Sequence, residues 1–394
     1  MNKEELLQAG LNLFKVFSPY LKEEEVELPS FSKEEFQNMA KLAKEHSLTA
    51  FLYCALDKYH YFAKLDNPKI EEYFRNHFLK NLRKTYLFEE ERNKLYQFFE
   101  ENKINYLPVK GVILNSMYPT LGSREFADND ILIDETRMKD TKKYFLSQGY
   151  DAGPSSLGSP HDEYYKEPSL NFEIHRFLFS ESDERSKSYY SYFRDTLTRN
   201  KRINHHSYMH LMSDEEFYVY FIAHANKHES FGGIGLRTLI DIYIYLKNKP
   251  NLNKEEVETL EKELEIYDLD CRLQAINNAL IDHKGELDEE YFLFLVSSGT
   301  YGTTDHAVKQ GIDREMKKGK DSKEAAKSYL MKRVFPPMSY YKTSHPLAYK
   351  TKVLIPFVWI GRLFAILFTP ERRKRAQNEY KTVKNHSENR SNKA

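Results

Sequence analysis

Asp128 and Asp130 stand two residues apart at the start of an apolar run that ends at Ile133. In a strand, side chains at positions i and i+2 project from the same face, so the two carboxylates would point together while Ile131 and Ile133 point into a core. Two adjacent carboxylates offer the hard oxygen ligands with which Mg²⁺ can hold a substrate's phosphates. The same residues would also fit a turn that leads into a strand, because Asp and Asn are favoured in turns, and they would then have no catalytic role.

A third carboxylate, Glu173, lies in a later strand-like run over residues 171–177. Glu173 and His175 alternate there with Phe172 and Ile174, so we expect them on one face. If this strand lies beside the strand with the aspartates, three carboxylates converge, as in sites for two-metal phosphoryl or nucleotidyl transfer. Taken alone, Glu173 fits an exposed edge-strand residue equally well, and His175 could either bond a catalytic carboxylate or pack near the sheet edge.

The elements that would position these carboxylates form a short succession of strands and helices in the middle of the chain. Apolar runs and turn residues predict the order strand, helix, strand, helix, strand, strand, which is typical of a compact unit on a small mixed sheet. The predicted strands are 104–109, 128–133, 162–167 and 170–177, the predicted helices begin at Lys110-Gly111 and at 136, and a Gly/Pro/Ser-rich loop covers 153–160.

Helical patterns precede and follow this unit, so we expect an α+β fold with a small mixed-sheet core flanked by helical regions. After the core, apolar faces predict helices over 215–228, 236–246, 254–267 and 271–281. The expected regions are an N-terminal helical region at 1–100, the core at 101–210, a C-terminal helical domain at 211–334, and an apolar helix with a basic, partly disordered tail at 335–394.

The composition is that of a globular chain without a charge excess. The 394 residues are 40% hydrophobic, which is enough for real cores, and Lys+Arg and Asp+Glu number 59 each. Proteins that coat nucleic acid usually carry a basic excess, so there is no strong nucleic-acid signal. Cys54 and Cys271 lack metal-ligand spacing and read as buried free thiols, which suit a reducing compartment. We therefore expect a cytoplasmic protein.

The most apolar stretch covers residues 353–368 and is interrupted by Pro356 and Arg362. It is shorter than the ~20 residues that a membrane-spanning helix needs, so a buried or docked helix is the first interpretation. A basic run, Arg372–Arg375, follows it, as in a membrane-surface anchor or a solvated helix end. Weak membrane-surface contact by residues 353–375 is therefore the second interpretation.

An ordered set of short motifs begins near residue 100 and continues with less specific matches to residue 368. Together the motifs resemble the uncharacterised nucleotidyltransferase family of the DNA polymerase β-like superfamily. They are Leu107-Pro-Val-Lys-Gly-Val, Tyr118-Pro119, Gly122-Ser-Arg124, Asp128-Asn-Asp130, Gly149-Tyr150 and Glu173-Ile-His175.

The resemblance implies a Mg²⁺-dependent transferase that moves a nucleoside monophosphate from an NTP, such as ATP, to an acceptor hydroxyl. It assigns Asp128 and Asp130 to the metal-binding pair. Glu173 matches the third carboxylate, which would bind a second metal and assist as a base toward the acceptor. The acceptor itself, a small molecule or a macromolecule, is not identified by any of these residues, and neither are the preferred base and the oligomeric state.

The same resemblance implies a phosphate-binding role for residues near the first predicted helix. Gly111 matches a glycine at a helix start, where backbone N–H groups approach the triphosphate, and Lys110 could add a point charge. Arg124 could reach a phosphate or be a surface arginine. Val112 departs from the family's usual Gly-Ser or Gly-Gly. This departure leaves a non-catalytic nucleotide-binding scaffold or sensor as the alternative function.

Two further features have a structural interpretation beside a functional one. The Gly122-Ser123 pair is a literal Gly-Ser motif, but it lies so close to Asp128 that we read it as a turn. His224 and His228 share a helix face at i and i+4. Zinc proteases use this spacing with a Glu after the first His, but this chain has Ala225 there. We therefore favour helix packing over a substrate-pocket role or a metal role for the two histidines.

Overall fold

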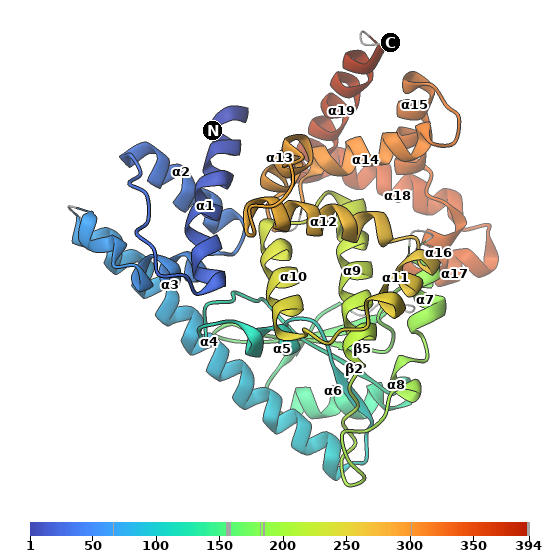
Figure 1. Cartoon of the computed structure of the whole chain (residues 1–394). Helices are drawn as coiled ribbons and strands as arrows, with labels where there is room; N and C mark the ends of the chain where they lie inside the picture. The colour runs from blue at the N-terminus through green and yellow to red at the C-terminus, as the bar shows by residue number, and fades with distance from the viewer. Residues whose placement is uncertain (66, 155–158, 182, 184–185, 301, 392–394) are drawn as a thin grey trace.

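The computed structural model describes residues 1–65, 67–154, 159–181, 183, 186–300 and 302–391. Within these residues one five-stranded sheet lies between two layers of helices (Figure 1). Its order is β1-β2-β5-β4-β3, with β2 and β5 parallel and the other neighbours antiparallel, so the predicted α+β fold with a small mixed sheet is confirmed. The strands are β1 (Tyr106–Pro108), β2 (Asn129–Ile133), β3 (Asp151–Ala152), β4 (His161–Lys166) and β5 (Leu170–His175).

One face of the sheet packs on α4 (Pro68–Glu101) and α6 (Met138–Ser147). Figure 1 shows the long helix α4 running along this side of the sheet, with α6 beside it. Strand alternation sends every second side chain into this layer, as the β-branched and aromatic residues of β2 and β5 predict. The buried side chains here include Phe88, Leu95, Phe99, Ile131, Ile133, Phe145, Tyr164, Phe172 and Ile174.

The other face of the sheet lies under α9 (Asp214–Phe231) and α10 (Leu236–Asn248) (Figure 1). Side chains of these two helices share one hydrophobic core with the helices at the N-terminus and with Leu107, Val109 and Leu132 of the sheet region. Other helices that contribute to this core include α1 (Lys3–Lys22), α2 (Lys33–Glu45), α3 (Thr49–Lys58), α11 (Lys254–Glu263), α12 (Tyr267–Leu280) and α13 (Glu289–Ser298).

The segment after residue 371 is helical as far as Ser391. Polar and apolar contacts hold α19 against the neighbouring helices. Glu379 accepts hydrogen bonds from Arg333 and Tyr329, and Val383 is buried; residues 392–394 lie outside the described part. The C-terminal helices are α14 (Thr304–Met316), α15 (Ser322–Val334), α16 (Met338–Ser344), α17 (Pro346–Thr351), α18 (Ile355–Phe368) and α19 (Pro370–Ser391).

Several short elements complete the chain, and two expectations are corrected. The two-residue edge strand β3 was not predicted because it is too short to show alternation. Cys54 is buried as expected, but Cys271 is exposed on α12; residues 155–158 of the predicted loop lie outside the described part. The short helices are α5 (Gly111–Leu114), α7 (Lys187–Phe193), α8 (Thr196–Arg199), η1 (Tyr61–Lys64), η2 (Asn115–Met117) and η3 (Glu135–Arg137).

A buried pair of carboxyl groups makes the stability of the helical core depend on pH. Glu261 is 1% exposed and faces Asp270, which already accepts hydrogen bonds from Tyr218 and Gln274. Burial and the Asp270 carboxyl raise the pKa of Glu261, so its proton is retained in the folded state.

Glu261→Gln is therefore expected to stabilise the protein at pH 8 by about 2 kcal/mol and to change little at pH 4. The pKa of Glu261 is higher in the folded than in the unfolded state. Its contribution to stability is therefore fully present below the unfolded-state pKa and is lost as pH rises toward the folded-state pKa. The Gln side-chain amide provides an N–H donor in place of the carboxyl O–H, and this donor does not titrate. Urea unfolding midpoints at both pH values measure this, with Glu263→Gln at an exposed position of α11 as control; an equal shift at the two pH values would contradict the prediction.

Candidate functional site

The parallel pairing of β2 and β5 brings the predicted carboxylates to one face of the sheet. Asp130 is the register partner of Glu173, so their side chains project side by side. Asp128 lies one residue before β2 and shares this face by alternation. Arg92 of α4 donates to the side chain of the intervening Asn129 over 2.9 Å on the opposite face, which fixes the strand entry. The predicted convergence of three carboxylates is therefore present in the fold.

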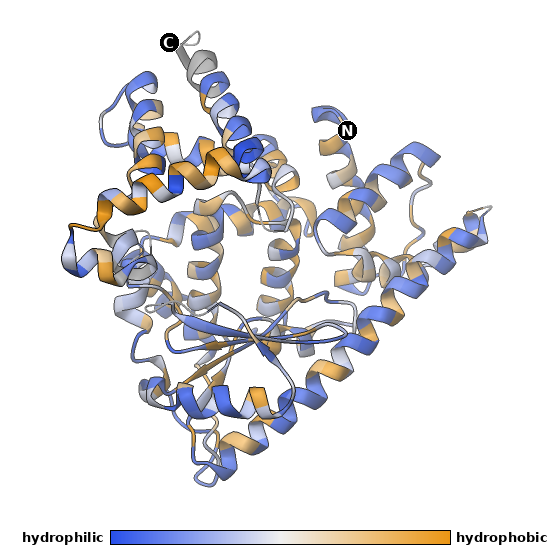
Figure 2. Ribbon diagram, turned by 180° about the vertical axis from the view of Figure 1, so that it is seen from behind, coloured by the Kyte–Doolittle hydropathy of each residue, from blue (hydrophilic) through white to orange (hydrophobic). Residues whose placement is uncertain are grey.

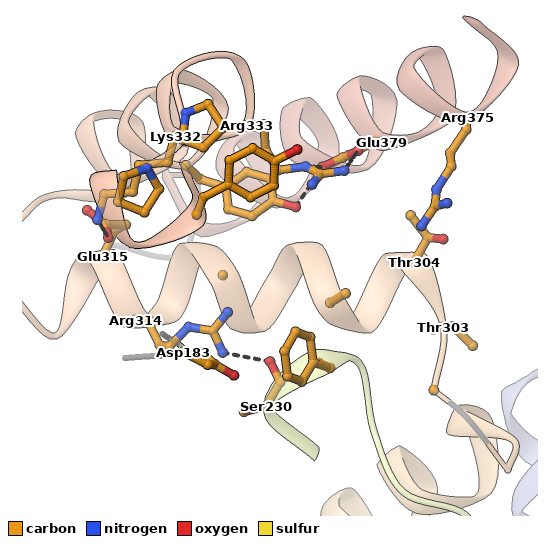
Figure 3. A pocket seen from close by; sticks show the side chains of 18 of the residues that line it. Asp183, Ser230, Thr303, Thr304, Arg314, Glu315, Lys332, Arg333, Arg375 and Glu379 are labelled. Carbon is orange, nitrogen blue, oxygen red and sulfur yellow. Dashed lines mark hydrogen bonds and ion pairs between the residues drawn. The ribbon is translucent and has the colours of Figure 1, made fainter. Parts of the chain in front are cut away.

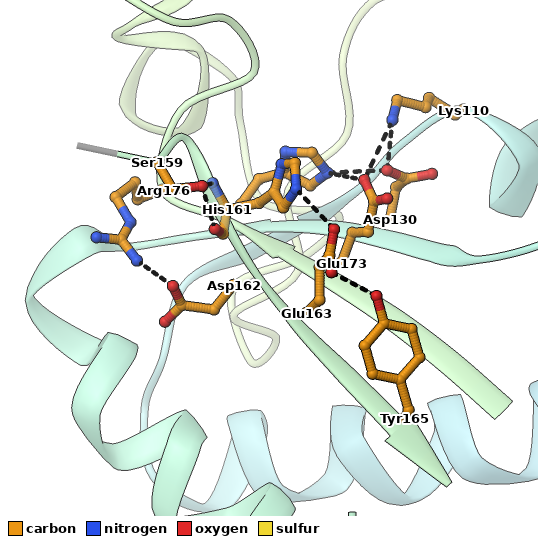
Figure 4. A network of polar contacts seen from close by, with 10 residues as sticks. Lys110, Asp130, Ser159, His161, Asp162, Glu163, Tyr165, Glu173 and Arg176 are labelled. Carbon is orange, nitrogen blue, oxygen red and sulfur yellow. Dashed lines mark hydrogen bonds and ion pairs between the residues drawn. The ribbon is translucent and has the colours of Figure 1, made fainter. Parts of the chain in front are cut away.

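Lys110 provides a positive charge at the centre of this group. Its Nζ donates to Asp130 Oδ1 over 2.5 Å and lies 3.8 Å from Glu173 Oε2. His175 Nε2 lies 2.8 Å from the same Asp130 oxygen and 3.5 Å from Glu173 Oε2. Figure 4 shows these side chains pointing toward one another above the sheet. Of the two interpretations of His175, the structure shows the bond to a carboxylate, that of Asp130.

The carboxylates of this group differ in their protonation. Burial and the adjacent Asp130 carboxylate raise the pKa of Asp128 to about 7. Burial acts in the same direction on Asp130, but Lys110 and His175 outweigh it and lower the pKa of that carboxyl. For His175, burial alone would lower the pKa, but the bonds of the ring to Asp130 and Glu173 raise it. Burial and the Asp130 carboxylate therefore both disfavour the charged form of Asp128.

His161, Glu173 and His175 form a second arrangement that could hold a metal ion. One ligand atom from each residue lies within 4.8 Å of the other two, and His161 and His175 are register partners on β4 and β5. Two imidazoles with one carboxylate suit transition ions such as Mn²⁺ or Zn²⁺. Sequence reasoning missed His161, because its position opposite His175 depends on strand register; a His at the start of a predicted strand was the signal present.

Helix α9 places His224, Lys227 and His228 over the same side of the sheet. The Nε2 atoms of the two histidines lie 3.2 Å apart. Burial and the charge of Lys110 lower the pKa of His224, and burial with the charge of Lys227 lowers that of His228 to about 4, so both rings are neutral at pH 7. The neutral, half-buried rings of His224 and His228 therefore pack within the helix layer and also lie next to the carboxylates.

Arg124 is not a surface arginine, because its guanidinium is buried and makes two hydrogen bonds to Asp241 of α10, of 2.8 and 2.9 Å. Tyr118 donates to the same carboxylate over 2.6 Å. Arg124 and Asp241 therefore form a buried ion pair. Sequence spacing could not reveal it, since the partners are 117 positions apart. The phosphate contact of Arg124 stays a prediction.

Arg124 also explains the glycine at the start of α5. A Cβ atom added to Gly111 would lie 2.8 Å from Arg124 Nη1, so the glycine leaves room for the guanidinium. Gly122 and Ser123 form a turn, as expected. The φ angle of Gly122 is +81°, a Cβ there would lie 2.9 Å from Leu82, and Ser123 Oγ donates to the Thr120 carbonyl over 2.6 Å.

A cavity of about 970 Å³ lies away from the sheet carboxylates, between α14, α15, α18 and α19 (Figure 3). Its walls carry many basic side chains, but carboxylates inside the cavity pair with several of them. Arg333 bonds Glu379, and Lys332 bonds Glu315. Paired cations of this kind serve the packing of the C-terminal helices, so the sheet carboxylates are the stronger candidate for chemistry.

A five-stranded mixed sheet with converging carboxylates and flanking helices defines an α+β nucleotidyltransferase core. A family model described as uncharacterised nucleotidyltransferase matches residues 32–271, which include the sheet, α9 and α10. The chain belongs to this family, which supports a general transferase role. No curated protein sequence matches the chain significantly.

Proposed function

We propose that this protein transfers a nucleoside monophosphate from an NTP, such as ATP, to an acceptor hydroxyl, with Mg²⁺ as cofactor. The observation that carries the proposal is the convergence of Asp128, Asp130 and Glu173 around the Lys110 ammonium. Carboxylates at this density have one common use in phosphate chemistry, which is to hold cations against a polyphosphate. Family membership supports the same reaction class.

The donor set fits Mg²⁺. Asp128, Asp130 and Glu173 offer oxygen ligands only, as this ion prefers. Burial and, after it, the Asp130 carboxylate raise the pKa of Asp128, and a bound cation would offset both effects. We assign these three carboxylates as the residues that would hold the ion, which when bound neutralises phosphate charge and aligns the reacting oxygens.

The chain's own groups have separate roles in the proposed reaction. Lys110, at the helix start beside Gly111, pairs with the phosphates of the nucleotide. Glu173 accepts the proton of the acceptor hydroxyl while the acceptor oxygen bonds to the α-phosphorus and pyrophosphate leaves. Burial opposes ionisation of Glu173, but its bond to His175 lowers its pKa, so it is in the proton-accepting form at pH 7. His175 holds Asp130 and Glu173 in place.

A second candidate, a nucleotide-binding protein without turnover, is favoured by one observation. The Lys110 ammonium already pairs with the Asp130 oxygen that a catalytic ion would use. In such a protein NTP would bind and no bond would break.

The two candidates are distinguished by pyrophosphate release. The protein is incubated with Mg²⁺, each of the four α-labelled NTPs and a cell extract as the source of acceptors. A transferase releases pyrophosphate in proportion to the label that enters an acceptor, and EDTA stops both. Calorimetric NTP binding without pyrophosphate release would favour the second candidate, and no binding of any NTP would exclude both.

A further inference from the structure

Helix α18 presents a stripe of large apolar side chains on the surface of the protein. Phe357, Phe364 and Phe368 are 66%, 54% and 74% exposed, and Ile360 and Leu367 lie between them along the helix. These positions recur every three or four residues, so they share one face. Figure 2 shows this helix as a nearly continuous hydrophobic segment at the periphery. Scattered exposed apolar residues are ordinary, but a continuous patch of this kind marks an interaction site.

The opposite face of α18 is attached to the rest of the protein. Ile355 is buried, and Trp359 Nε1 donates to Tyr341 Oη over 2.5 Å. Arg362 donates to the main-chain carbonyl of Arg333 over 3.0 Å. One side of α18 is therefore packed against the rest of the protein, and the phenylalanine stripe lies on the side that is exposed to solvent.

Basic side chains flank both ends of the stripe. Lys350 and Lys352 precede α18, and Arg372–Arg375 follow it at the start of α19; all of these residues are exposed. Because Lys+Arg and Asp+Glu balance over the whole chain, this positive charge is a local feature of the region around α18.

We propose that α18 binds in the surface layer of a membrane that contains anionic lipids. The phenylalanine stripe enters the acyl region, and Lys350, Lys352 and Arg372–Arg375 contact the lipid phosphates. Among the residues that the structure describes, no helix is both long and apolar enough to cross a bilayer. At 14 residues, α18 is about 21 Å long and lies along the surface.

A second copy of the chain is a poorer occupant of this face. A two-fold interface is self-complementary, so two α18 helices crossing antiparallel would place Arg372–Arg375 of one copy near Lys350 and Lys352 of the other. Like charges facing each other oppose association, whereas anionic lipid head groups neutralise both clusters at once. Charge thus selects the lipid surface over self-association.

The test uses the full chain and vesicles of phosphatidylglycerol and phosphatidylcholine in equal parts, with pure phosphatidylcholine vesicles for comparison. We expect the protein to sediment with the anionic vesicles and at least 10-fold less with the neutral ones. Trp359 is the only tryptophan of the chain, so its emission reports the surroundings of α18 directly and should shift to shorter wavelength on binding.

Two variants separate the apolar and electrostatic contributions. Phe357→Glu/Phe364→Glu should lower vesicle binding at least 10-fold, as should replacing Arg372–Arg375 by Gln. Leu146→Glu, at a 50% exposed leucine on α6, is the matched control and should bind normally. Circular dichroism of each variant checks folding.

Three outcomes would overturn the proposal. One is the absence of binding to anionic vesicles. Another is binding that both variants retain. The third is sedimentation equilibrium showing a dimer that Phe364→Glu dissociates, since the stripe would then be covered by a second copy.

Discussion

Asp128→Asn and Asp130→Asn are each expected to reduce nucleotidyl transfer by about 10³-fold or more. The carboxylates of these two residues are assigned to hold the cation, and the loss of one ligand removes several kcal/mol of transition-state stabilisation. Asn keeps the size and hydrogen bonding of the side chain, so the fold should be retained. Mg²⁺-dependent NTP binding, measured by calorimetry, should fall together with pyrophosphate release.

The matched control for these variants is Asp140→Asn on α6. Asp140 forms a partly exposed ion pair with Arg137 and lies on the helix layer opposite the site. Its replacement should leave both measurements unchanged. Full NTP binding in Asp128→Asn and Asp130→Asn, with Mg²⁺ present, would remove the metal assignment.

Replacing Arg124 by Met is expected to lower the free energy of unfolding by about 3–5 kcal/mol. The guanidinium and the Asp241 carboxylate are 6% and 4% exposed and bond each other through two contacts. Removing the cation leaves Asp241 buried and charged with only the Tyr118 hydroxyl as partner, which is the costly way to break a buried pair. Urea unfolding measures the loss.

The double variant Arg124→Met/Asp241→Asn provides the internal comparison. It removes both charges, so it should be more stable than Arg124→Met alone. Arg137→Met, which breaks the exposed pair with Asp140, should cost about 1 kcal/mol or less. A loss of that size in Arg124→Met would show that Arg124 has no special structural role.

The strand pattern alone predicted the face of the sheet on which the carboxylates lie. Asp130 and Glu173 alternate with apolar neighbours, and alternation is a local property that needs no knowledge of the fold. The parallel pairing of β2 with β5 could only be hypothesised, because it joins segments about 40 positions apart. The order of predicted strands and helices was likewise readable, and the family resemblance added roles to residues that the pattern had already selected.

The contacts that sequence reasoning missed are those formed across the tertiary structure. The buried ion pair of Arg124 was missed because its partner, Asp241 of α10, lies 117 positions away in the sequence. His161 reaches Glu173 and His175 only through the register of β4 with β5. The contact of Glu379 with Arg333, which joins α19 to α15, is likewise formed only across the C-terminal helices.

The position of Lys110 has a consequence for how the site would be loaded. Its ammonium bonds the Asp130 carboxylate, which in the proposed site would also hold the divalent cation, so the ammonium and the cation would compete for that carboxylate. A nucleotide that draws Lys110 onto its phosphates relieves this competition and frees the carboxylate. Binding of nucleotide and cation is then thermodynamically linked with positive sign, and the linkage is reciprocal. Lys110 would thus keep the carboxylates from capturing free cations and make them receptive when substrate arrives.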